Sequence, residues 1–241
     1  MSSQTTPMTT APFPTRRTFS PRTEQTIEVL VFLFLIVPSM ILSLFIAQQP
    51  GVSFVVVGLS TIFRDLGLVA LIVFFLWRNG EPLRLIGWTS RAAWKEFLIG
   101  VVLFVPSFFF TSFLNQALRV AGLSSPSALP SFLTPTGGPQ FVLAIILVVI
   151  VAVAEETIFR GYLIRRFENV TRLPVISVLL SAIVFALGHG YEGGAGVLTV
   201  GVMGLIFALV YLWRRSLVAP ITMHFLQDFL GIVLLPLLRF H

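Results

Sequence analysis

The sequence predicts an all-α fold, a polytopic transmembrane helical bundle of about seven spans. The first observation behind this fold class is composition. Of the 241 residues, 56% are hydrophobic and 11% are charged, and the mean hydropathy is +0.95, which excludes an ordinary soluble domain. The second observation is that the apolar residues form runs near the roughly 20 residues that an α-helix needs to cross a bilayer. These runs occupy residues 26–47, 53–77, 93–119, 139–164, 174–190, 196–213 and 217–238.

The segment before the first run differs from the rest of the chain. Residues 1–25 are rich in Ser, Thr and Pro and contain three arginines, a composition typical of disorder. We therefore expect a disordered, basic N-terminal tail, and we see no pattern of a cleaved signal peptide in it. Residues 26–241 show no internal repeat, so we expect them to form one membrane domain.

The basic residues indicate how the bundle lies in the membrane. The net charge of +6 and the pI near 11 are compatible with nucleic-acid binding, but Lys and Arg gather before the first span and after the second, fourth and sixth spans. Residues 48–52, 120–138 and 190–195 contain neither. The positive-inside rule then predicts a cytoplasmic N-terminus. We expect a multi-pass protein of a bacterial plasma membrane, with the lipid bilayer and no nucleic acid as partner.

Two carboxylates and one guanidinium interrupt the fourth span. Glu155, Glu156 and Arg160 follow fourteen unbroken apolar residues, 141–154. Each charge would cost roughly 2.5–3.5 kcal/mol at the bilayer centre, so such groups normally face a protein interior or a wet cavity and mark function. Glu156 and Arg160 are one helical turn apart and are expected to pair. Glu155 lies about 100° round the helix without a nearby counter-ion, which makes it the candidate general base.

Two histidines in other apolar runs are candidate partners of Glu155. His224 and Asp228 in the seventh span repeat the one-turn spacing, and a carboxylate can orient an imidazole. His189 ends the fifth span, with Phe185 one turn before it. Each group alone is compatible with a structural role, such as a helix-end His bonded to a carbonyl or a polar contact between helices. Together, an unpaired Glu, two His and an Asp in three apolar segments are typical of a catalytic site.

These residues form three motifs that resemble those of the CAAX-protease and bacteriocin-processing family of intramembrane proteases, also called the Abi family. The motifs are Glu-Glu-x-x-x-Arg, Phe-x-x-x-His and His-x-x-x-Asp or Asn, each in a hydrophobic segment and in this order. All three are complete here: Glu155, Glu156 and Arg160; Phe185 and His189; His224 and Asp228. The resemblance covers about residues 141–235 and places the protease core at about 139–238.

The resemblance implies a CAAX prenyl protease-like endopeptidase that cleaves a membrane protein or hydrophobic peptide. Glu155 with His189 would hold and deprotonate a water molecule. His224, steered by Asp228, would stabilise the oxyanion or protonate the leaving amine, and the Glu-Arg pair of the first motif would support them. The family has been described both as metal-dependent and as a metal-free glutamate type. Glu155, His189 and His224 could supply a His₂Glu zinc set, but no His-Glu-x-x-His motif is present, so we favour an enzyme without a cofactor.

Two other function classes use the same features. A transporter would use the carboxylates and imidazoles as a mid-membrane proton relay, but its usual inverted repeats and paired broken helices are not seen. A non-catalytic membrane scaffold would need neither Glu155 nor the histidines. Arg64 and Asp65 also interrupt an apolar run. We expect them to mark an irregular stretch, or one that runs along the membrane interface, rather than a site.

Overall fold

The described part of the chain is all-helical, as predicted. The computed structural model describes residues 20–46, 49, 51–89, 92–124, 126 and 130–240. Most of the predicted tail, residues 1–19, lies outside this part. The first helix, α1 (Pro21–Ile46), begins within the predicted tail rather than at residue 26. Pro21 at the first helical position and the Ser20 side chain, which accepts a hydrogen bond from the Thr23 N–H over 3.2 Å, favour this earlier start.

The remaining helices follow the predicted order. They are α2 (Phe54–Arg78), α3 (Ala93–Val120), α4 (Gly138–Glu156), α5 (Ile164–Thr171), α6 (Pro174–Leu187), α7 (Gly193–Arg214), α8 (Val218–Asp228) and α9 (Leu235–Phe240). Two π-helical segments, η3 (Thr157–Leu163) and η5 (Phe229–Leu234), join α4 to α5 and α8 to α9. Three short 3₁₀ turns complete the described chain: η1 (Leu83–Ile86), η2 (Ser131–Leu133) and η4 (Gly190–Glu192).

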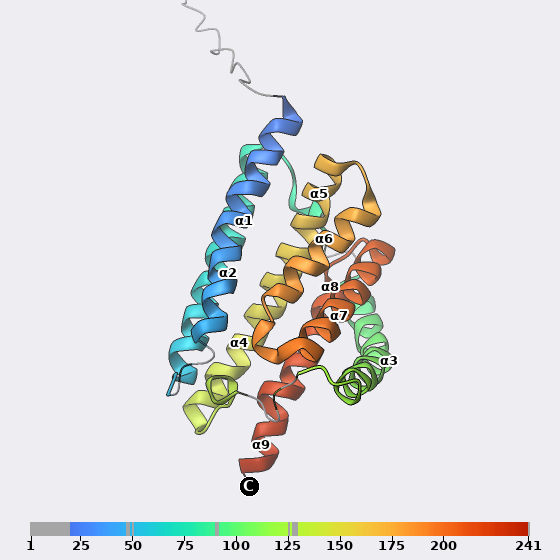
Figure 1. The fold of residues 1–241 in the computed structure, drawn as a ribbon. Coiled ribbons are helices and arrows are strands. Elements are labelled where there is room, and N and C mark those ends of the chain that lie inside the picture. Colours follow the sequence, from blue (N-terminus) through green and yellow to red (C-terminus); the bar gives the residue numbers. More distant parts are fainter. Residues whose placement is uncertain are drawn as a thin grey trace, which may run out of the picture.

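Six of the described helical segments are long and apolar enough to cross a bilayer. The seventh, α6, has 14 residues. Helix α4 packs against α2 and α8, α3 packs against α7 and α8, and α6 packs against α5 and α7. Figure 1 shows α3 on the flank of the bundle opposite α1 and α2. The prediction of a transmembrane bundle of about seven spans is confirmed.

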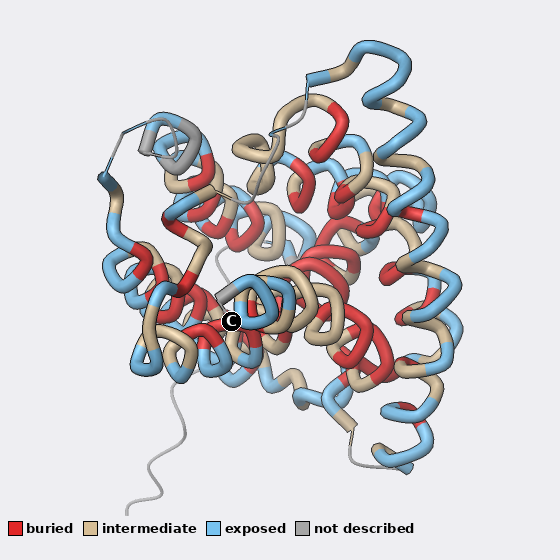
Figure 2. Tube along the Cα trace, turned by 90° about the horizontal axis from the view of Figure 1, so that it is seen from below, coloured by how far each residue is buried: buried red, intermediate tan, exposed pale blue. Residues whose placement is uncertain are grey.

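The outer faces of the helices are apolar, as lipid contact requires. Figure 2 shows the buried residues gathered where the helices meet and the exposed ones on the outer faces. Phe34, Trp77 and Phe113 are each about three-quarters exposed, at 75%, 76% and 74%. A soluble monomer rarely exposes apolar area on this scale, so these faces belong against hydrocarbon.

The basic connections predicted from the sequence lie together at one end of the bundle, called the basic end below. Arg22 of α1 donates to the Val170 carbonyl over 2.5 Å. Arg214, at the end of α7, forms a 2.7 Å ion pair with Glu96 at the start of α3. The start of α1, the end of α5, the start of α3 and the end of α7 therefore share one end. That this end faces the cytoplasm remains a prediction.

The fourth helix continues further than predicted. Residues 138–171 form one unbroken helical segment, whereas the predicted span ends at residue 164. Arg166, expected in a basic connection, is 0% exposed. Its guanidinium donates to both carboxylate oxygens of Glu81, over 3.0 and 2.7 Å, and its Nε lies 3.3 Å from Glu28 Oε2. These two carboxylates neutralise Arg166 and allow it to be buried.

The fifth helix is shorter than predicted. Helix α6 ends at Leu187, so His189 lies in the turn after it rather than inside a span that runs to residue 190. Gly188 and Gly190 flank His189. Helix α7 begins at Gly193, before the predicted residue 196, and Gly193 has a φ of +73°, a conformation that favours glycine.

Candidate active site

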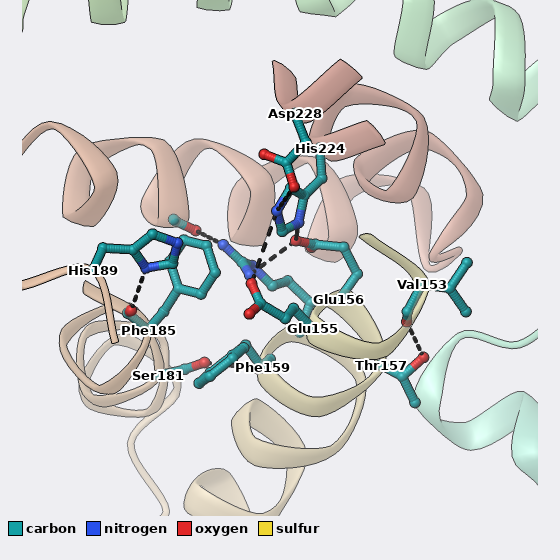
Figure 3. Close-up of polar contacts among 12 residues, drawn as sticks. Val153, Glu155, Glu156, Thr157, Phe159, Ser181, Phe185, His189, His224 and Asp228 are labelled. Atoms are coloured by element: carbon teal, nitrogen blue, oxygen red, sulfur yellow. Dashed lines mark hydrogen bonds and ion pairs between the residues drawn. The ribbon is translucent and has the colours of Figure 1, made fainter. Parts of the chain in front are cut away.

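A cavity of about 1390 Å³ lies inside the helical bundle. Four of the predicted site residues line it: Glu155 of α4, His189 after α6, and His224 and Asp228 of α8. Figure 3 shows these side chains converging from three different parts of the chain. The structure thus brings together residues separated by up to 73 positions in the sequence (155 to 228).

Glu156 lies behind the cavity wall and links two of the motifs. Its side chain is 0% exposed. Oε1 lies 2.9 Å from Arg160 Nη1, so the predicted ion pair is present. The same oxygen lies 2.9 Å from His224 Nδ1. Because a carboxylate oxygen accepts, Nδ1 of His224 carries the hydrogen and donates it. This contact between α4 and α8 was not predicted.

Arg160 is buried and contacts a backbone carbonyl and two aromatic rings. It is 1% exposed, and Nη2 donates to the Gly204 carbonyl over 3.4 Å. Its guanidinium carbon lies 4.2 Å from the centre of the Phe185 ring and 5.4 Å from that of Phe207, within the range of cation–π attraction. Phe185, the aromatic member of the second motif, therefore supports the arginine of the first.

Two π-helical segments begin directly after motif residues. Segment η3 follows Glu156 and segment η5 follows Asp228. π-helical segments are rare in proteins, and those that occur are often found at functional sites. In η3, the Phe159 carbonyl accepts a 2.6 Å hydrogen bond from the Ser181 hydroxyl of α6, and Figure 3 shows the two residues side by side. This bond gives a backbone acceptor in the altered helix a buried partner. No residue pattern in the sequence indicated either segment.

His224 faces carboxylates with both ring nitrogens. Besides the Nδ1 contact with Glu156, Nε2 lies 3.5 Å from Asp228 Oδ2 and 3.8 Å from Glu155 Oε2. The last distance is too long for a direct hydrogen bond. Glu155 Oε2 has no hydrogen-bond partner among the described residues, and the Glu155 side chain is 13% exposed. One carboxylate oxygen of a residue that lines the cavity thus has an unused capacity to accept a hydrogen bond.

His189 is oriented by its own helix end. Its Nδ1 lies 3.0 Å from the Phe185 carbonyl oxygen, and because that oxygen can only accept, Nδ1 donates. In a neutral imidazole this leaves Nε2 as an acceptor. The ring also lies 4.8 Å from the centre of the Phe185 ring. The bond to a carbonyl expected of a helix-end histidine is present, and it leaves the second nitrogen for other chemistry.

The comparison with protein families covers this same region. Residues 137–230 match the family described as Rce1-like, type II CAAX prenyl endopeptidase. Over these residues the chain is similar to that family. The match confirms the resemblance read from the three motifs, all of which fall inside it. No curated protein and no solved structure matches the chain.

The family match and the apolar helices together indicate the general class of the protein. The family is one of CAAX-type endopeptidases, and six described helical segments can cross a bilayer. The protein is therefore an integral, multi-pass membrane protein, and residues 137–230 are similar to a family of proteases. Helices α1, α2 and α3 lie outside the matched residues, yet α2 and α3 supply part of the cavity wall.

The zinc ligands considered from the sequence, Glu155, His189 and His224, do not form a metal-binding group in the described part of the chain. Among the described residues, no group of three His, Asp or Glu side chains is arranged to hold a metal ion. Of the candidate ligands, His189 donates from Nδ1 to the Phe185 carbonyl and His224 donates from Nδ1 to Glu156, so each ring keeps only Nε2 for other contacts. We therefore assign no step of the reaction to a metal.

The cavity contains polar residues that the sequence analysis missed. Arg64, Tyr191 and Gln227 also line it. The expectation of an irregular stretch at Arg64 and Asp65 is wrong, because α2 is continuous from Phe54 to Arg78. Arg64 Nη2 instead pairs with Asp65 Oδ1 over 2.9 Å. An adjacent Arg and Asp in an apolar run do not reveal which side faces a cavity, and this had to come from the packing of α2.

Proposed function

We propose that this protein is an intramembrane endopeptidase that hydrolyses a peptide bond of a membrane protein or hydrophobic peptide, with water activated by Glu155 and His189. The observation that carries the proposal is the environment of Glu155. Its Oε2 is buried without a hydrogen-bond partner among the described residues, and Glu155 lines the same cavity as both histidines. The Rce1-like match favours this activity over a proton-coupled transporter or a scaffold.

In the proposed first step, a water molecule lies between Glu155 and Nε2 of His189. Glu155 takes one proton from it, and the water oxygen attacks the carbonyl carbon of the scissile peptide bond. The π electrons of the carbonyl group move to its oxygen, which becomes an oxyanion. A positioned general base of this kind contributes typically about 10²–10⁴-fold to the rate.

In the proposed second step, the tetrahedral intermediate collapses. The C–N bond breaks, its electrons stay on nitrogen, and the leaving amine takes a proton. We assign His224 to this end of the reaction as a doubly protonated ring between the carboxylates of Glu156 and Asp228. Its Nε2–H would donate either to the oxyanion or to the amine, and proton transfer to the amine leaves the ring neutral. A single oxyanion donor contributes on the order of 3–4 kcal/mol.

Glu156, Arg160 and Asp228 would act through His224. Glu156 accepts from Nδ1 over 2.9 Å and so determines which ring nitrogen faces the reacting groups. Arg160 fixes Glu156 through the 2.9 Å ion pair. Asp228, 3.5 Å from Nε2, holds the other side of the ring. They are positioning residues in this proposal.

The proposed activity is tested in cells, where the substrate also becomes known. Membrane peptides would be compared by mass spectrometry between cells with the wild-type protein and cells with Glu155→Gln. The matched control is Glu168→Gln, since Glu168 is an exposed residue of α5. We expect a precursor to accumulate only with Glu155→Gln, and its missing product to identify the cleaved bond. Identical peptide profiles for all three proteins would contradict the proposal.

A further inference from the structure

The cavity occupies only one half of the bundle. Its wall comes from the last part of α1, the first part of α2, the last part of α3, the second half of α4 with the start of η3, the end of α6, the first part of α7 and the segment from α8 to α9. All of these parts lie away from the basic end. The loop residues 130–136, between α3 and α4, also line it. None of the described basic residues of the basic end does so: Arg22, Arg78, Arg84, Lys95, Arg165, Arg166, Arg172, Arg214 and Arg215.

Packed side chains fill the other half of the bundle. At the end of η3, Tyr162 and Leu163 are fully buried. Turn η1 packs directly on η3, because a Cβ built at Gly161 would lie 2.7 Å from the Ile86 carbonyl oxygen. Still closer to the basic end, Arg166 closes the interior through Glu28 and Glu81. Between Glu155 and the basic end, the described residues thus form a packed core.

The two ends of the molecule differ in charge as well as in packing. The basic end carries the Lys and Arg residues that the positive-inside rule assigns to the cytoplasm. At the opposite end, where the cavity opens, the described loop residues 120–124, 126 and 130–138 contain no charged residue. The arginines of that end that line the cavity are Arg119 in the last turn of α3 and Arg239 in α9. The cavity therefore opens at the end that the charge distribution places on the non-cytoplasmic side.

We infer that the substrate reaches Glu155 from the non-cytoplasmic face of the membrane. The substrate class that follows is a hydrophobic peptide segment exposed on that face, such as part of an exported peptide or the outward end of a membrane protein. A segment presented only in the cytoplasm would meet the packed basic end. That this segment is cleaved depends on the function proposed above, whereas the direction of access does not.

The absence of Cys from the sequence makes this inference directly testable. Single cysteines would be introduced as Gln227→Cys, inside the cavity, and Arg172→Cys, exposed at the basic end. Right-side-out and inverted membrane vesicles would be treated with a membrane-impermeant maleimide. The wild-type chain is the blank, and a permeant maleimide on each folded variant shows that the thiol can react.

We expect Gln227→Cys to be labelled in right-side-out vesicles and Arg172→Cys only in inverted ones. Labelling of both residues only in inverted vesicles would overturn the inference, and so would labelling of Gln227→Cys from neither side. Labelling of Arg172→Cys from outside and of Gln227→Cys from inside would overturn the substrate class. Because no cleavage is measured, repeating the experiment in the Glu155→Gln background separates a failure of this inference from a failure of the proposed reaction.

Discussion

His224 Nδ1 donates a hydrogen bond to Glu156 Oε1 over 2.9 Å. The contact joins α8 to the last residue of α4 and is buried on both sides, since the two side chains are 2% and 0% exposed. The same carboxylate oxygen pairs with Arg160. One buried carboxylate therefore determines the positions of a guanidinium and an imidazole, and the geometry of the site depends on it.

The first prediction concerns this shared carboxylate. Arg160→Ala would leave Glu156 without its guanidinium partner inside the bundle, and breaking a buried pair in this way costs about 3–5 kcal/mol of unfolding free energy. We expect a marked fall in the melting temperature in detergent. The control, Arg119→Ala, changes an exposed arginine and should leave the melting temperature unchanged. If Arg160→Ala abolished activity at an unchanged melting temperature, Arg160 would act in the reaction rather than in the support of Glu156.

The second prediction compares two arginines that look alike in the sequence. Arg166→Ala removes the buried partner of Glu28 and Glu81, so we expect a loss of about 3–5 kcal/mol in stability. Arg172→Ala changes an exposed residue and should have little effect, because surface substitutions usually change stability by less than about 0.5 kcal/mol. Thermal unfolding of both variants in the same detergent measures the difference. Equal melting temperatures would show that Arg166 is not a stabilising contact.

The third prediction concerns metal. The described Glu155, His189 and His224 side chains do not form a ligand set, so we expect purified protein to contain far less than one zinc per chain and to keep its cleavage rate through prolonged chelation. A metal-dependent site would lose metal and activity together. Loss of activity with a chelator, restored by added zinc and not by magnesium, would contradict the glutamate mechanism.

The fold class was predictable because a bilayer requires long apolar helices, and their lengths can be read directly. The Glu156–Arg160 pair was predictable because both residues lie on one helix at a fixed spacing. The contact between Glu156 and His224 was not, since it depends on how α4 packs against α8. The burial of Arg166 was missed for the same reason: its partners are Glu28 and Glu81, far away in the sequence.

The end of α6 illustrates a second limit. The predicted span runs past Leu187 to residue 190, but Gly188 and Gly190 surround His189 and the helix stops before it. Hydrophobicity predicts that a segment is buried, and it does not determine where the helix ends. The π-helical segments after Glu156 and Asp228 were missed because they depend on tertiary partners such as the Ser181 hydroxyl.

The central claim is that the Glu155 carboxylate activates water, and the most direct measurement is the cleavage rate of purified Glu155→Gln in proteoliposomes, with the precursor found in cells as substrate. Gln keeps the volume and polarity of Glu but cannot take a proton, so we expect kcat to fall by about 10²–10⁴-fold with an unchanged melting temperature. Glu168→Gln should keep the wild-type rate. A near-normal rate for Glu155→Gln would contradict the proposed mechanism.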